Sequence, residues 1–137
     1  ETAKFFFFDT GIVSNLLEQR SLSPGTTEYG RAFEHFILKE CWAYRHYSKL
    51  EFPISFWRTA SGAEVDLILG NAEVALEIKA STNVANRTKG LHLFHEENKC
   101  RKSFIISKEQ RPRKISSQIT VLPWQNFCKM LWAGDIL

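Results

Sequence analysis

The sequence predicts a single α/β domain in which helices flank a mixed β-sheet. Two observations support this. Segments with helical spacing of apolar residues and segments with strand-like alternation follow one another in the order helix, three strands, helix, strand. The length of 137 residues suits one hydrophobic core and is short for two. We therefore expect one domain over residues 1–137.

The first part of the chain is expected to form a strand and two helices. Residues 4–8 are apolar enough for a short buried strand, and residues 12–17 follow a turn as a short helix. Thr26 or Thr27 can cap a long helix over residues 28–48. The apolar stripe of this long helix consists of Phe33, Phe36, Ile37, Cys41 and Tyr44.

The rest of the chain supplies the sheet. Strands are expected over residues 53–59, 64–69, 73–80, 103–107 and 119–122. Helices are expected over residues 87–99 and 124–132, and residues 110–114 form a basic loop.

Composition limits the class of protein. A net charge of +3 permits contact with a polyanion without requiring it. The three cysteines lie far apart, which argues against a disulfide framework or a zinc ribbon and suits the reducing cytoplasm. The longest apolar run, residues 5–8, is far shorter than a membrane span, so no membrane partner is expected. Because the first residue is not Met, we expect a carboxy-terminal fragment of a longer protein.

The hairpin over residues 64–79 is the most informative segment. Strand side chains alternate between the two faces of a sheet. One face is expected to be apolar and covered by a helix, and it comprises Val65, Leu67, Leu69, Val74, Leu76 and Ile78. The opposite face then carries Glu64, Asp66, Ile68, Ala75, Glu77 and Lys79.

Two hairpin registers satisfy this pattern. If Gly70 pairs with Glu73, Asp66 lies directly opposite Glu77. If the turn falls one position earlier, Asp66 is diagonal to Glu77 and Glu64 becomes the direct neighbour. In both registers two carboxylates lie within roughly 5 to 8 Å of each other, where like charges repel unless a cation lies between them.

Two carboxylates, a divalent cation and a nearby ammonium are what phosphodiester hydrolysis requires. Lys79 follows Glu77 by two residues, so it projects from the same face about 7 Å further along the strand. A metal with oxygen ligands lowers the pKa of a bound water and offsets phosphate charge. The lysine can orient that water and stabilise developing charge. The alternative is that these charged side chains lie on the solvent-exposed outer face of a half-buried hairpin and have no chemical role.

Motifs along nearly the whole chain resemble a known superfamily. Residues 4–11, 30–34 (Gly-Arg-Ala-Phe-Glu), 62–66 (Gly-Ala-Glu-Val-Asp) and 77–81 (Glu-Ile-Lys-Ala-Ser) carry the resemblance. The superfamily is PD-(D/E)xK, with a restriction-endonuclease-like αβββαβ core. Specifically, the chain resembles the carboxy-terminal domain found behind AAA-type ATPase domains in many bacterial and archaeal proteins. Val65 stands where the superfamily has its proline.

The resemblance implies site residues and a function. Asp66 and Glu77 would be metal ligands, Lys79 the catalytic lysine, and Glu34 a further acidic ligand on the first core helix. Glu34 falls at the margin of the apolar stripe, so it is either such a ligand or an exposed helix glutamate.

The implied activity is Mg²⁺- or Mn²⁺-dependent cleavage of DNA, coupled to an upstream ATPase domain of the same chain. The chain itself has no Gly-x-x-x-x-Gly-Lys-Ser/Thr loop. The alternative is a non-catalytic module that binds DNA or a partner protein and regulates the ATPase.

Basic residues are densest near the fourth strand of the core. The cluster consists of Arg101, Lys102, Lys108, Arg111, Arg113 and Lys114. It can follow the phosphates of a nucleic acid beside the site, or it can be a solvated loop.

Overall fold

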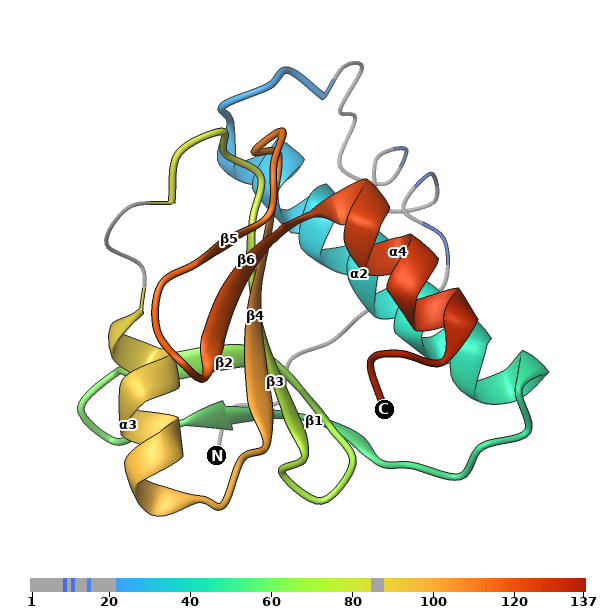
Figure 1. Ribbon diagram of the computed structural model, residues 1–137. Coiled ribbons are helices and arrows are strands. Elements are labelled where there is room, and N and C mark those ends of the chain that lie inside the picture. The colour runs from blue at the N-terminus through green and yellow to red at the C-terminus, as the bar shows by residue number, and fades with distance from the viewer. Residues whose placement is uncertain (1–8, 10, 12–14, 16–21, 85–87) are drawn as a thin grey trace.

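The computed structural model describes residues 9, 11, 15, 22–84 and 88–137, which include a six-stranded mixed sheet with helices on both faces (Figure 1). This confirms the expected α/β class. The strand expected over residues 4–8 lies outside the described residues, as does all but residue 15 of the helix expected over residues 12–17. No helix among the described residues combines the length and the apolar character that crossing a bilayer requires.

The sheet has the strand order β1-β2-β3-β4-β6-β5. The strands are β1 (Ile54–Arg58), β2 (Glu64–Leu69), β3 (Val74–Lys79), β4 (Lys102–Ser107), β5 (Arg113–Lys114) and β6 (Ile119–Pro123). The first three strands form an antiparallel meander, and β4 and β6 continue the sheet in parallel with β3. The short strand β5 lies within the expected basic loop and pairs antiparallel with β6.

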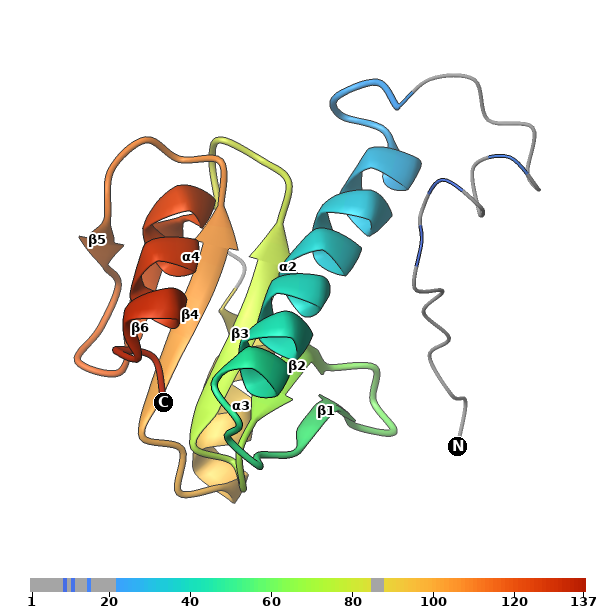
Figure 2. The same ribbon diagram turned by 90° about the vertical axis from the view of Figure 1, so that its right-hand side faces the viewer.

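In the described ranges, three helices cover the sheet: α2 (Thr27–Tyr47), α3 (Lys89–Glu97) and α4 (Trp124–Ala133). Helices α2 and α4 lie side by side on one face, and α3 lies on the other (Figure 2). The long helix begins where the sequence predicts, because the Thr26 hydroxyl accepts a hydrogen bond from the backbone N–H of Tyr29 at 3.2 Å.

Each face of the sheet has its own apolar core. Under α2 and α4, buried side chains of α2 such as Ile37 and Cys41 pack on the sheet. Under α3, Leu91 and Phe94 do the same. Phe36 is an exception to the predicted stripe, since it is 37% exposed. Its ring packs edge-on against Trp124 at the start of α4, with 5.5 Å between centroids, instead of entering the core.

The β2–β3 hairpin has the first of the two expected registers, because Leu69 pairs with Val74. Five of the six predicted apolar residues pack under α2 and α4, but the prediction is wrong for Val65, which packs on the α3 face. Pairing with β1 explains this. The four residues 65–68 of β2 lie opposite the three residues 55–57 of β1. The extra residue in β2 forms a β-bulge, which reverses the alternation of side chains between the two faces.

Candidate functional site

The side chains of Asp66, Glu77 and Lys79 meet at the end of the β2–β3 pairing. The Lys79 ammonium lies 2.7 Å from Oε1 of Glu77 and 3.7 Å from Oδ2 of Asp66. Both carboxylates are buried, with 4% of Asp66 and 8% of Glu77 exposed, whereas Lys79 is partly exposed. The structure thus brings together three of the four residues singled out in the sequence. Two carboxylates and an ammonium at such short range interact strongly, so the protonation of each depends on the charge of the others.

A backbone group holds Asp66 in position. Its Oδ2 accepts a hydrogen bond from the backbone N–H of Ile78 at 2.7 Å. The regular pairing of β2 with β3 ends one residue before this point, at Leu67 and Leu76. Beyond that pair, a side-chain carboxylate takes the place of a main-chain acceptor. The carboxylate is therefore fixed between two strands rather than free to rotate on a surface.

Glu77 has an unsatisfied oxygen. Its Oε2 is buried and has no hydrogen-bond partner among the described residues. A buried polar atom normally has a partner, because removing it from water costs free energy that only a new interaction offsets. The pKa of Glu77 is raised to about 7, because burial and, to a smaller extent, the charge of Asp66 outweigh the lowering influence of Lys79. This oxygen can accept a cation.

We expect the metal-free protein to lose stability as the pH rises from about 4.5 to about 7. The unfolded chain releases the Glu77 proton near 4.5, whereas the folded protein holds it until about pH 7. The unfolded state therefore binds fewer protons in this window, and rising pH favours unfolding. Above pH 7 the Glu77→Gln variant should be more stable than the parent by about 2 kcal/mol.

Urea unfolding in EDTA at pH 5, 6, 7 and 8 measures this. Glu96→Gln is the matched control, because Glu96 is an exposed glutamate of α3. Its pH profile should follow that of the parent. If Glu77→Gln also follows the parent profile, the raised pKa is wrong.

Glu34 lies on α2 and is partly buried. Among the described residues, no group of three His, Cys, Asp or Glu side chains is arranged to hold a metal ion. Glu34 therefore does not form such a group with Asp66 and Glu77. Its role as a further ligand stays a prediction.

The predicted basic cluster divides into two groups at opposite ends of β4. Arg101 and Lys102 lie at its start, about 17 Å of strand away from its end. Lys108 and Arg111 follow its end, which is the end that lies beside Lys79, since Lys79 pairs with Ser107. Only this second group is close to the carboxylates, although the sequence suggested one cluster.

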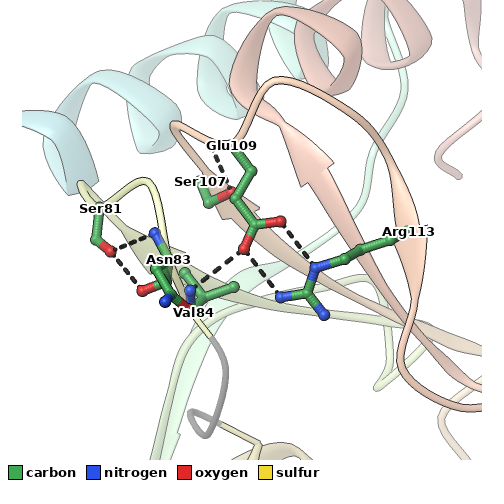
Figure 3. Close-up of polar contacts among 6 residues, drawn as sticks. All are labelled: Ser81, Asn83, Val84, Ser107, Glu109 and Arg113. Atoms are coloured by element: carbon green, nitrogen blue, oxygen red, sulfur yellow. Dashed lines mark hydrogen bonds and ion pairs between the residues drawn. The ribbon is translucent and has the colours of Figure 1, made fainter.

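Glu109 connects the loops at this end of the sheet (Figure 3). Its carboxylate accepts two hydrogen bonds from the Arg113 guanidinium, at 2.8 and 2.9 Å, and one from the backbone N–H of Val84 at 3.2 Å. Its own N–H donates to Ser107 Oγ at 3.1 Å. The hydrogen bonds from Arg113 hold the pKa of Glu109 below its usual value. Sequence reasoning missed Glu109, because its partner in the loop after β3 is far away along the chain.

A family model described as a domain of unknown function, DUF4143, matches residues 29–127. The matched range contains the three converging side chains and both basic groups. Neither the curated proteins nor the solved structures gave a match to this chain.

Proposed function

Since the chain belongs to the DUF4143 family, whose description states no activity, we propose a function from the site itself. It is a metal-dependent nuclease of the PD-(D/E)xK type that hydrolyses phosphodiester bonds of DNA, as the carboxy-terminal module of an AAA-type ATPase. One observation carries the proposal. Oε2 of Glu77 is buried without a hydrogen-bond partner in the described part of the chain, and it belongs to a carboxylate that shares the Lys79 ammonium with Asp66.

The two carboxylates suit a small hard cation. Mg²⁺ commonly takes one or two protein carboxylates and completes its shell with water and substrate oxygens. Asp66 and Glu77 would hold Mg²⁺ or Mn²⁺, and Glu34 would add a ligand through water. A cation would give Oε2 of Glu77 a partner that the described residues do not supply, and it would offset the burial and the repulsion from Asp66 that raise the Glu77 pKa. The residues present therefore fit the metal.

Each side chain then has a definite task. The ion, when bound, acidifies a water molecule and offsets the charge of the phosphate. Lys79 donates hydrogen bonds to the attacking water or to a phosphate oxygen and stabilises the negative charge that develops. The Ile78 N–H keeps Asp66 oriented, so little reorganisation is needed when substrate arrives.

We expect the protein to nick supercoiled plasmid DNA in Mg²⁺ or Mn²⁺ and to lose this activity in EDTA. The Asp66→Asn variant should be inactive, because it removes the negative charge of a metal ligand. Asparagine keeps the shape of the side chain, so the fold should not change. Divalent ions should raise the melting temperature of the parent, by an amount equivalent to about 1.4 kcal/mol at ten times the Kd, and should not raise that of Asp66→Asn.

Asp135→Asn serves as the control, since Asp135 is an exposed acid near the chain end, and this variant should keep both properties. Nicking that persists unchanged in Asp66→Asn would falsify the proposed mechanism. Absence of ion-dependent stabilisation in the parent would contradict the metal site.

The alternative function is a non-catalytic module that binds DNA or protein and regulates the ATPase. This module would bind its partner without cleaving DNA under any metal. The same two measurements separate it from the nuclease, because it predicts no nicking and no effect of Asp66→Asn on ion-dependent melting.

A further inference from the structure

A hollow of about 400 Å³ lies beside the carboxyl ends of β3 and β4. Thr82, from the loop after β3, lines one part of it, and residues 108–113, from the loop after β4, line the rest. Three of the lining side chains are basic, Lys108, Arg111 and Arg113, and one is acidic, Glu109. The hollow is therefore electropositive.

The positive charge of the hollow is largely uncompensated. Glu109 is engaged in a two-pronged ion pair with Arg113. The contacts of the Lys108 ammonium within the described part of the chain are with a neutral residue, since its Nζ lies 3.1 Å from the Tyr29 hydroxyl oxygen and 4.9 Å from the Tyr29 ring centroid. No ion pair between described residues involves Lys108 or Arg111. Arg111 is exposed to solvent at the rim. Two cations are thus available to an anion.

The walls of the hollow are held in place. The backbone N–H of Lys108 donates to the carbonyl of Ser81 at 2.9 Å. A turn at Ser81 is closed by its own hydroxyl, which accepts from the N–H of Asn83 at 3.0 Å (Figure 3). Glu109 adds the hydrogen bond from Val84. The two loops are therefore joined before any ligand arrives, which lowers the entropic cost of binding.

Arg113, at one side of the hollow, lies on the same face of the sheet as Glu77, whereas Lys108 reaches toward Tyr29 of α2. Glu77 pairs with Ile105, Ile105 with Val121, and Val121 with Arg113. Residues at paired positions project from the same face, so this row runs from the carboxylates to the hollow. Three strand spacings separate its ends, or about 14 Å.

We propose that this hollow binds a phosphate of the DNA strand that is cleaved at Asp66 and Glu77, at a position several nucleotides from the scissile bond. Lys108 and Arg111 donate to the phosphate oxygens, and Arg113 contributes through the outer edge of its guanidinium. At a rise of 3.4 Å per nucleotide, a separation of about 14 Å corresponds to about four nucleotides of a duplex. Contacts of this kind set the register of a nucleic acid on the protein without reading its bases. The inference rests on the proposed function.

Fluorescence anisotropy with a labelled 20-base-pair duplex in EDTA tests the proposal, because neither metal nor cleavage takes part. We expect Arg111→Gln to weaken binding roughly three- to tenfold and to reduce the slope of log K against log salt by about 0.9. Lys108→Gln should act in the same direction. Arg101→Gln is the matched control, since it removes the same charge from an exposed arginine at the far end of β4, and it should bind like the parent.

Two results would overturn the inference. One is an equal loss of affinity in Arg111→Gln and Arg101→Gln, and the other is an unchanged salt slope in both pocket variants. The proposed function is judged separately by ion-dependent melting, which should be the same in Arg111→Gln as in the parent. A parent that gains no stability from divalent ions but still binds DNA through Arg111 would refute the nuclease and the assignment of the bound strand as its substrate.

Discussion

Replacing Lys79 with Met is expected to lower the rate of DNA nicking roughly 100-fold or more while leaving divalent-ion binding in place. The ammonium is the one cationic group shown within reach of both carboxylates among the described residues. Removing a preorganised donor at the place where charge develops typically costs a factor of about 10² to 10³ in rate. Methionine keeps the linear four-atom apolar stem of the side chain and lacks the ammonium at its end. Single-turnover nicking at saturating Mg²⁺ measures the effect.

Lys79→Met should also lower the stability of the metal-free protein, whereas removing a metal ligand should lower the stabilisation that a divalent ion gives. Without the ammonium 2.7 Å from Glu77, two buried carboxylates lose their counter-charge. We expect a loss of about 1 to 3 kcal/mol in the free energy of unfolding at pH 8. Because a divalent ion would supply the missing charge, its stabilising effect should be larger in Lys79→Met than in the parent.

Lys102→Met is the control, because Lys102 begins β4 at the opposite end of the sheet and is also partly exposed. It should nick DNA at the parent rate. Unchanged nicking in Lys79→Met would remove the lysine from the mechanism. A variant that lost both nicking and ion-dependent stabilisation would show that Lys79 only supports the shape of the site.

Local patterns predicted most of the fold because most elements bury one face. The long helix and the two strands of the hairpin begin and end within one residue of their expected bounds. The errors come from pairing with distant segments. The face of Val65 depends on a bulge against β1, and β5 exists only because two residues of a loop pair with β6. Neither contact leaves a periodic signal in the sequence.

The candidate site shows the same division. Alternation along one strand placed Glu77 and Lys79 on one face, and the hairpin register brought Asp66 to them. The hydrogen bond from Ile78 could not be predicted, because it requires the two strands to part beside Asp66. The strand predicted over residues 103–107 already lies between Arg101 and Arg111, so treating the basic residues as one cluster overlooked the length of that strand. The hollow could not be predicted either, because it depends on the contact of Glu109 with Val84 in the loop after β3, which is distant in the sequence.

The second large effect is expected at Gly90 in the first turn of α3. This helix packs so closely on β2 that a Cβ atom at Gly90 would lie well inside van der Waals distance of the Glu64 carbonyl oxygen. Since the clash is with backbone, a side-chain rotation cannot relieve it. We expect Gly90→Ala to lower the free energy of unfolding by about 1 to 2 kcal/mol, because overpacking costs about 1 to 3 and the better helix propensity of alanine returns up to about 1. Chemical denaturation measures it.

The displacement should also reach the site. Glu64 lies two residues before Asp66 on the same strand, so moving the strand away from α3 shifts the carboxylate that accepts the hydrogen bond from Ile78. Stabilisation of Gly90→Ala by Mg²⁺ should therefore be weaker than that of the parent. A weaker ion effect in a variant that remains folded would connect the packing of α3 to the geometry of the carboxylates.

Gly30→Ala is the control, because it should change the free energy of unfolding in the opposite direction. Gly30 also lies in a helix, but nothing lies within 4 Å of the position its Cβ would take. With no clash, alanine should stabilise the protein by up to about 1 kcal/mol through helix propensity alone. Both changes add one methyl group in the first turns of a helix, and the added group meets backbone at Gly90 but open space at Gly30. If both variants were stabilised, α3 would have to lie further from Glu64 of β2 than described.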